Sequence, residues 1–221
     1  MLDCPSARIS PPSSGQAQIK AAELSALARK FNALAGAQAD EAKLAHEVAT
    51  GAELPVIDPS DGKPFASIAR GDAPDIDIAV RAARASFEGA WGALAPVERG
   101  RRLMALSRAI LDHADELAWI EARDCGKPMK QARADAAACA RYFEFYAGAP
   151  DKLHGDTIPY TPGSTVLTWR EPLGVTGHII PWNYPMQIFG RSVGGALAAG
   201  NACVVKPAED ACLSLLRIAE L

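Results

Sequence analysis

Two short clusters of polar residues each follow an apolar run of strand-like sequence. The first cluster is Pro181-Trp182-Asn183, directly after the apolar run 175–180, and the second is Lys206-Pro207-Ala208-Glu209, after the run 202–205. A cation and a carboxylate three residues apart could hold the two hydroxyl groups of a ribose. An exposed ion pair beside a structural tryptophan would show the same spacing, so the spacing by itself leaves both interpretations open.

The elements around these clusters predict that the fold brings them together. Val175–Ile180 is a short apolar run that indicates a buried strand, and Ala202–Val205 indicates a second one. Between them, Pro185 suits the first turn of a helix and Gly200 its end. Strand, helix and strand predict a right-handed βαβ unit with parallel strands. Ligands bind beyond the carboxyl ends of such strands, where both clusters would lie side by side.

Five blocks of this sequence resemble the aldehyde dehydrogenase superfamily. Two of them contain the polar clusters, Ile179–Pro185 and Gly200–Glu209. The others agree in order and spacing: Val56–Lys63, Asp124–Pro128 and the stretch from Tyr146 to Pro159. The resemblance covers roughly residues 54–221, and the first fifty residues show none of it. Several ordered motifs make chance a poor explanation.

The resemblance implies an NAD(P)-dependent enzyme that oxidises an aldehyde to a carboxylic acid. Such an enzyme needs a cysteine thiolate, a glutamate as general base and hydrogen-bond donors for the developing oxyanion. By the match of motifs, Asn183 is the side-chain oxyanion donor, although a turn asparagine that caps its loop would fit the same position. The aldehyde itself is not identified by these residues.

The same match assigns the cofactor-binding residues. Lys206 and Glu209 are placed on the adenosine ribose, and the cleft is lined by Ile180, Pro181, Trp182, Asn183, Pro207 and Ala208. A carboxylate accepts hydrogen bonds from a ribose 2′-hydroxyl and repels a 2′-phosphate, so Glu209 favours NAD. Lys206 would tolerate the phosphate, which keeps NADP possible. No GxGxxG motif occurs in the sequence.

The sequence stops before the family's catalytic cysteine and general-base glutamate. We do not expect a substitute nucleophile among Cys125, Cys139, Cys203 and Cys212. Cys203 lies in an apolar strand and Cys139 in an alanine-rich helix face. A helix N-terminus would lower the pKa of Cys212, but acidic neighbours oppose this. Two functions therefore compete: the cofactor-binding N-terminal part of an aldehyde dehydrogenase, inactive alone, and a catalytically inactive nucleotide-binding or interaction module from a truncated or split gene.

Composition excludes several other classes of function. The chain is 49% hydrophobic and 22% charged, which is typical of a globular protein. Its net charge of −3 does not indicate a basic surface for nucleic acid. No apolar run is long enough to span a membrane. The five cysteines form no CxxC pair, the histidines have no metal-ligand spacing, and no secretory signal is evident. We expect a cytoplasmic protein without a metal.

The predicted fold is α/β: a Rossmann-like, three-layer αβα arrangement with a parallel sheet, preceded by helices and carrying a protruding β-hairpin arm. Residues 54–153 and 171–221 form an incomplete cofactor-binding domain, 1–53 a partly disordered extension, and the catalytic domain is absent. Residues 154–170 form the hairpin, whose edges would seek a partner. In the resembled family this segment bridges subunits, which implies a homo-oligomer through the arm or a complementary C-terminal half.

Helical spacing also predicts which side chains are buried. In the helix that Pro74 opens, the apolar face contains Ile76, Val80, Ala83 and Phe87. In the helix over about 131–147, we expect Ala138, Tyr142 and Phe145 to point inward. Asp210 is placed to cap the last helix. Residues 17–49 predict one further amphipathic helix, after a disordered segment over 1–16.

Overall fold

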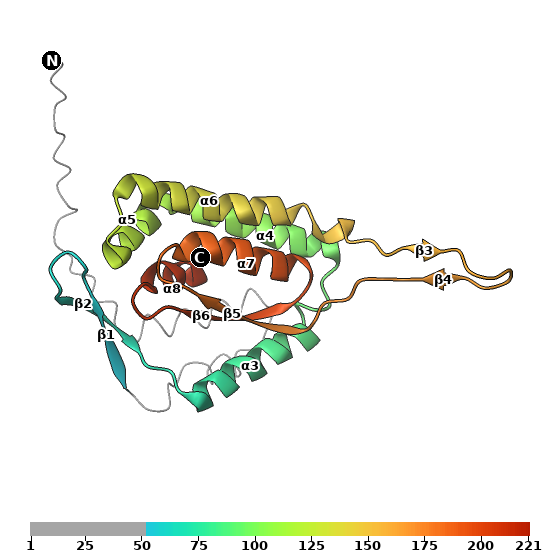
Figure 1. Cartoon of the computed structure of the whole chain (residues 1–221), viewed down its shortest axis with the longest axis horizontal. Helices are drawn as coiled ribbons and strands as arrows, with labels where there is room; N and C mark the ends of the chain where they lie inside the picture. Colours follow the sequence, from blue (N-terminus) through green and yellow to red (C-terminus); the bar gives the residue numbers. More distant parts are fainter. Residues whose placement is uncertain (1–51) are drawn as a thin grey trace, which may run out of the picture.

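The computed structural model describes residues 52–221, so the predicted disordered segment 1–16 and helix 17–49 lie outside the described residues. In chain order the elements are β1 (Glu53–Ile57), β2 (Pro64–Ala69), α3 (Ala73–Glu88), α4 (Pro96–Asp112), α5 (Ala114–Cys125), α6 (Met129–Ala147), the 3-10 turn η1 (Pro150–Lys152), β3 (Thr157–Ile158), β4 (Val166–Leu167), β5 (Val175–Ile180), α7 (Pro185–Ala198), β6 (Ala202–Pro207) and α8 (Leu213–Glu220) (Figure 1). The result is an α/β fold with three small sheets.

The unit β5–α7–β6 forms the centre of the fold. Strands β5 and β6 pair in parallel, from Val175 opposite Ala202 to Ile180 opposite Pro207, as expected for these two segments. Helix α7 covers one face of the pair and α3 contacts the other (Figure 1). Gly200 turns the chain out of α7 with a φ of 94°, a backbone conformation that glycine adopts without strain.

The main hydrophobic core lies between α4, α6 and α7. Its fully buried side chains include Ile110, Leu117, Phe143, Met186 and Val193. Helices α6 and α7 approach closely at Gly190, where a Cβ atom would lie 3.2 Å from the Cα and Sγ atoms of Cys139. Phe143 and Phe189 pack across this contact with ring centroids 5.7 Å apart. Gly194 of α7 packs against α6 in the same way, so the core depends on small residues at this helix contact and on aromatic packing.

Two predicted helix faces differ from the structure. Of the residues expected to point inward from α6, Ala138 and Tyr142 are half-buried and Phe145 is exposed; the fully buried positions are Ala132, Asp135, Ala136, Cys139, Ala140 and Phe143. Residues two positions apart in the sequence point roughly 200° apart around a helix. Because Phe143 faces the core, Phe145 faces solvent and is 63% exposed. In α3, only the second half of the helix contains buried residues, Ala83 and Ser86. Ile76 and Val80, in the first half, are exposed.

Two antiparallel hairpins flank this centre. Strands β1 and β2 pair from Glu53 opposite Ala69, and Val56 packs against Leu213 of α8. Strands β3 and β4 make two residue pairs, and their hairpin extends away from the helices (Figure 1). Each strand covers two residues of the predicted hairpin 154–170, and Trp169, two residues after β4, is exposed. Among residues 52–221, no helix combines the length and apolar character needed to cross a membrane.

Phe143→Ala tests the corrected face of α6. We expect it to lower the free energy of unfolding by about 3–5 kcal/mol, because it leaves a cavity in the core. Phe145→Ala is the matched control and should cost less than about 1.5 kcal/mol, including its edge contact with Tyr146. Urea titration of the two variants measures both values. Equal losses would show that the two faces are assigned wrongly.

Candidate functional site

The two polar clusters lie next to each other in the structure. Ile179 is opposite Lys206 and Ile180 is opposite Pro207, so the chain segments that follow β5 and β6 leave the same edge of the sheet. We call residues 181–184 the Asn183 loop and residues 208–212 the Glu209 loop. Pro181, Trp182 and Asn183 are exposed, with Trp182 at 61%. Ile180 is buried in the core, so only its main chain can line a cleft.

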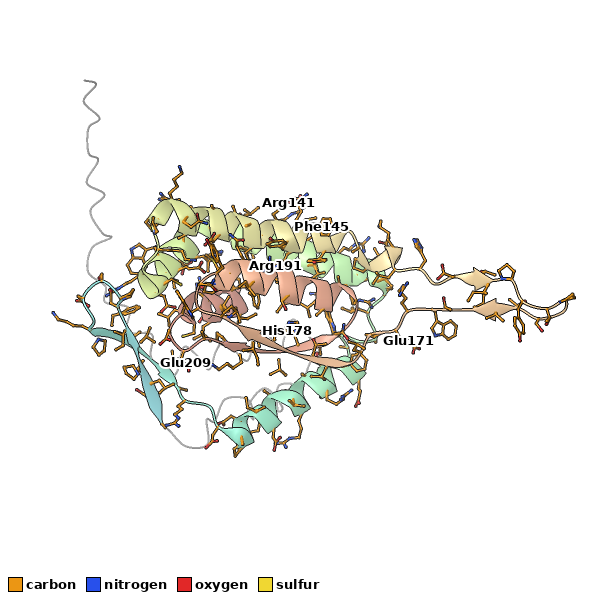
Figure 2. The ribbon with its side chains drawn as sticks, viewed as in Figure 1. Arg141, Phe145, Glu171, His178, Arg191 and Glu209 are labelled. Carbon is orange, nitrogen blue, oxygen red and sulfur yellow. The ribbon has the colours of Figure 1, made fainter. Side chains whose placement is uncertain are left out.

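Lys206 and Glu209 form an ion pair at the surface. The Lys206 Nζ and Glu209 Oε2 atoms lie 2.5 Å apart, and both side chains are exposed. The hydrogen bond from Lys206 lowers the pKa of Glu209, so this carboxylate is charged at neutral pH. Glu209 lies on the side of the molecule remote from the β3–β4 hairpin (Figure 2). This geometry suits a ribose-binding pair and equally an exposed ion pair, the two interpretations that spacing left open.

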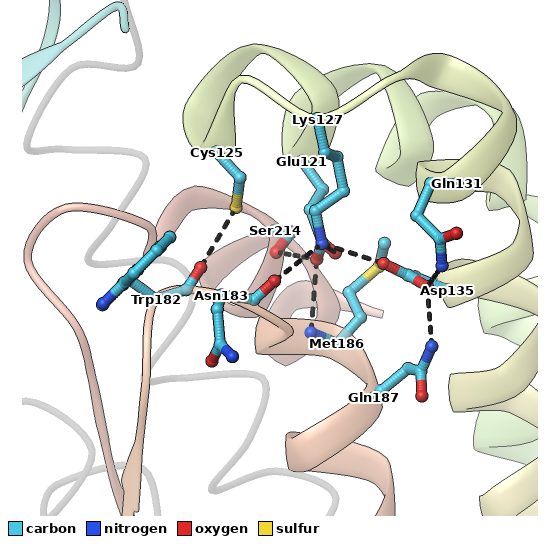
Figure 3. A network of polar contacts seen from close by, with 10 residues as sticks. All are labelled: Glu121, Cys125, Lys127, Gln131, Asp135, Trp182, Asn183, Met186, Gln187 and Ser214. Atoms are coloured by element: carbon cyan, nitrogen blue, oxygen red, sulfur yellow. Dashed lines mark hydrogen bonds and ion pairs between the residues drawn. The ribbon is translucent and has the colours of Figure 1, made fainter.

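A buried ionic network contacts the Asn183 loop on the side that faces helices α5 and α6. The network consists of Glu121, Lys127 and Asp135 (Figure 3). The Lys127 Nζ atom lies 2.6 Å from Glu121 Oε1 and 2.8 Å from Asp135 Oδ2, and both carboxylate side chains are fully buried. In the sequence, Lys127 stands out only as a member of the Asp124–Pro128 block. The Asp124–Pro128 block was the available signal, but its partners lie on other helices.

The carboxylates of α5 also bind the starts of the two helices that follow the site loops. Glu121 Oε2 accepts hydrogen bonds from the main-chain N–H of Met186, 3.2 Å away, and from Ser214 Oγ, 3.0 Å away. Asp124 Oδ2 accepts a hydrogen bond from the main-chain N–H of Leu213 at 2.8 Å. These positions carry the unpaired amides of α7 and α8. A single helix therefore holds both loops in place.

The predicted cap of α8 by Asp210 is wrong. Asp210 lies exposed in the preceding turn, and Cys212 is the N-cap residue but makes no side-chain cap bond. Asp124, 89 residues earlier in the chain, binds the first amide of the helix instead. Local sequence favours an aspartate just before a helix. The turn directs that aspartate to solvent, and the buried carboxylate of α5 takes its place.

Burial and hydrogen bonding shift the pKa values of the network's two carboxylates, and of Asp124 beside it, in different directions. Burial raises the pKa of Asp124 to about 6, and its Oδ1 atom has no hydrogen-bond partner within residues 52–221. Burial also raises the pKa of Glu121, against the opposing effect of Lys127. For Asp135, burial is outweighed by hydrogen bonds from Lys127, Gln187 and Gln131, which lower its pKa. Asp135 is therefore the firmly charged partner of Lys127.

The cysteines of the described chain are not activated thiols. Burial raises the pKa of Cys125 and of Cys212 to about 12 and that of Cys203 to about 11. It raises the pKa of Cys139 as well. At Cys212, burial outweighs any effect of the helix N-terminus, and Asp124 adds to the shift. Within residues 52–221, no thiolate is therefore available at neutral pH.

The comparisons with known proteins agree with these motifs. Residues 47–221 match the aldehyde dehydrogenase family, so the match begins inside the predicted extension 1–53. Over 172 residues the chain is 46% identical to a hydroxyisobutyraldehyde dehydrogenase of Mycolicibacterium austroafricanum, a match that covers 78% of this chain and 34% of that protein. The chain thus spans about a third of the length of the curated relatives it matches.

Solved structures show the same similarity. A Burkholderia cenocepacia protein inferred to be an aldehyde dehydrogenase is 74% identical with a TM-score of 0.77, over 78% of this chain and 36% of that one. An aldehyde dehydrogenase from Bacillus cereus in complex with NAD⁺ is 39% identical with a TM-score of 0.76, over 77% of this chain and 35% of that one. The described α/β fold therefore matches the fold of these proteins.

The raised pKa of Asp124 predicts a defined pH dependence of stability. An acid whose pKa is higher in the folded state contributes most below its unfolded pKa, and that contribution is lost as the pH rises through about 6. Asp124→Asn removes the charge and keeps an acceptor. We expect the variant to gain stability relative to the unmodified chain by on the order of 2–3 kcal/mol between pH 4 and pH 8. Urea titrations at three pH values measure the difference.

Asp210→Asn is the control for this experiment, since it removes one exposed carboxylate from the turn before the same helix. Its difference from the unmodified chain should change far less across the same pH range. A constant difference between Asp124→Asn and the unmodified chain would contradict the raised pKa.

Proposed function

The chain belongs to the aldehyde dehydrogenase family, and we propose that it is the cofactor-binding N-terminal part of an enzyme that oxidises an aldehyde to a carboxylic acid with NAD. The observation that supports this most directly is the placement of the Asn183 loop beside the Glu209 loop at one edge of the sheet. This arrangement puts an amide donor next to a candidate ribose-binding pair. The NAD⁺ complex of the related Bacillus cereus protein supports the choice of cofactor.

In this proposal, Asn183 donates a hydrogen bond to the oxyanion that forms when a thiolate attacks the aldehyde. Its side chain is exposed, points away from the Lys127 network and has no hydrogen-bond partner among residues 52–221 (Figure 3). A free, neutral amide is a donor at any working pH, and it need not break another bond to act. Bound NAD would supply the hydride acceptor that the oxidation requires.

Lys206 and Glu209 then hold the ribose, and Ile180, Pro181, Trp182, Pro207 and Ala208 line the cofactor cleft. Glu209 is charged and exposed, so it can accept hydrogen bonds from ribose hydroxyls. Its charge disfavours a 2′-phosphate, which supports NAD over NADP. Because residues 52–221 offer no thiolate, we assign the nucleophile to a residue outside this range, and by the family resemblance the general-base glutamate as well.

The finer architecture is also part of the proposal. Residues 54–153 and 171–221 would form a Rossmann-like, three-layer cofactor-binding domain. The β5–β6 pair packed between α3 and α7 supports this, because it has the helix, sheet, helix order of such a domain. Residues 154–170 would be an arm that bridges subunits, since Tyr160 and Trp169 expose large aromatic surfaces on it. The free cysteines suit a reducing compartment, and we place the protein in the cytoplasm.

On its own, the 221-residue chain should not oxidise aldehydes. With the thiol pKa values at about 11 or higher, incubation with NAD and a panel of aliphatic and aromatic aldehydes should yield no NADH absorbance. NAD should bind weakly, because each charge-assisted contact that the chain cannot make costs about 10- to 100-fold in affinity. Calorimetry measures the binding. Aldehyde oxidation by the chain alone would contradict our assignment of the nucleophile.

A chimera tests the two site assignments together. In it, residues 52–221 replace the matching part of the 74%-identical Burkholderia cenocepacia protein. We expect Asn183→Ala to lower kcat by roughly 10²–10³ with little change in the KM for NAD, because the lost donor acts on the oxyanion. Glu209→Ser should shift the preference towards NADP and leave kcat nearly unchanged. Both variants are assayed with both cofactors.

Each variant serves as the control for the other. If Asn183→Ala changed only the affinity for NAD, the roles assigned to the two loops would be wrong. A chimera that binds NAD but oxidises no aldehyde would instead favour a nucleotide-binding module without catalysis.

A further inference from the structure

We propose that Lys127 is a positioning residue: by binding the main-chain carbonyl of Asn183 from the buried side of the loop, it fixes the direction of the Asn183 side chain. This inference rests on the proposed function of Asn183. Lys127 contacts the loop through the Asn183 main chain and not through the Asn183 amide, and no pattern in the local sequence connects it with a loop 56 residues away. The support comes from the hydrogen bonds of the Lys127 ammonium group and from the further hydrogen bonds that its partners Glu121 and Asp135 make with the start of α7.

The three hydrogens of the Lys127 ammonium have three acceptors in three different elements. These acceptors are Glu121 Oε1 of α5 at 2.6 Å, Asp135 Oδ2 of α6 at 2.8 Å and the main-chain carbonyl oxygen of Asn183 at 3.3 Å (Figure 3). An ammonium group has only these three donors. The third hydrogen bond therefore joins the buried ion pairs directly to the residue that carries the proposed oxyanion donor.

The same network continues into the residues that follow Asn183. The Lys127 Nζ atom lies 5.0 Å from the centre of the Tyr184 ring. Glu121 accepts a hydrogen bond from the main-chain N–H of Met186, and Asp135 accepts one from Gln187 Nε2 at 2.7 Å. Four of the five residues from 183 to 187 thus contact the network, and the fifth, Pro185, is buried. The loop is fixed to the first turn of α7 as one unit.

Charge explains why a lysine is required at this position. When Glu121 and Asp135 are both ionised, these two buried carboxylates and one ammonium carry one net negative charge next to the start of α7. A helix N-terminus favours a negative charge, but a second unpaired one would be costly to bury. Removing Lys127 alone would strand two carboxylates and could unfold the chain. A test must therefore keep the charge constant.

The consequence for function follows from the freedom of the Asn183 side chain. Its amide has no partner of its own within the described residues, so its direction depends on the main chain that carries it. Of the proposed NAD contacts, Lys206 and Glu209 lie outside the network, and the main chain of Trp182 is held by a different group, the Cys125 thiol, whose Sγ atom lies 3.4 Å from the Trp182 carbonyl oxygen. Loss of Lys127 should thus disturb the oxyanion donor and leave cofactor binding intact.

The charge-matched variant is Lys127→Met combined with Glu121→Gln. It keeps one net negative charge, Asp135 keeps its hydrogen bonds from Gln131 and Gln187, and the new amide oxygen can still accept from Met186. Two controls accompany it. Glu121→Gln alone keeps the lysine, and Lys130→Met removes an exposed lysine three residues away on α6. Lys130→Met should behave like the unmodified protein, and Glu121→Gln, which keeps the ammonium group and its hydrogen bond to Asn183, measures what the change at Glu121 contributes by itself.

The first measurement uses the full 221-residue chain and NMR relaxation of the Asn183 main-chain amide. The order parameter should fall from about 0.85 to below about 0.6 in the charge-matched variant, while amides in the centre of α7 stay rigid. An unchanged order parameter at Asn183 in a folded variant would overturn the proposal. This measurement does not depend on activity, so it decides the positioning role even if the oxyanion assignment fails.

The second measurement uses the chimera. The charge-matched variant should lower kcat by roughly 10- to 100-fold with the KM for NAD unchanged within about 2-fold. On an Asn183→Ala background the same change should cost less than about 2-fold, since the positioned group is gone. Additive losses would overturn the positioning role. If Asn183→Ala itself left kcat unchanged, the proposed function would fail independently.

Discussion

One ammonium group, that of Lys127, makes it possible to bury two carboxylates between α5, α6 and α7. Glu121 and Asp135 are fully shielded from water, and an uncompensated charge in such a place destabilises a protein by several kcal/mol. The lysine offsets this cost and donates its remaining hydrogen to the carbonyl oxygen of Asn183. The ion pairs that hold the helices together therefore also determine the path of the candidate site loop.

Helix α5 extends this dependence to the second loop. Its two carboxylates, Glu121 and Asp124, bind the first amides of α7 and α8, the helices that follow the Asn183 and Glu209 loops. Helix starts need such acceptors wherever water is excluded. A shared support keeps the two loops in register with each other. The same support accounts for Asp124, a buried carboxylate with a pKa of about 6 that binds the first amide of α8.

The site itself combines a rigid base with an open surface. On the buried side of the loops, Lys127, Glu121 and Asp135 all have hydrogen-bond partners, whereas on the outer side Ile179 is 83% exposed and the Asn183 amide has no partner among residues 52–221. A donor that must act on a transient charge benefits from a fixed main chain and an unoccupied side chain. The chain supplies this combination within about a third of the length of its relatives.

The sequence by itself determined the family, the β5–α7–β6 unit and the meeting of the two polar clusters, because apolar strand runs, helical spacing and ordered motifs are local patterns. Tertiary structure decided the rest. It turned Phe143 rather than Phe145 into the core, gave the cap of α8 to Asp124 rather than Asp210, and joined Lys127 to Asn183. Partners 56 and 89 residues apart meet only when helices pack, and no local pattern encodes which buried charge will face which helix start.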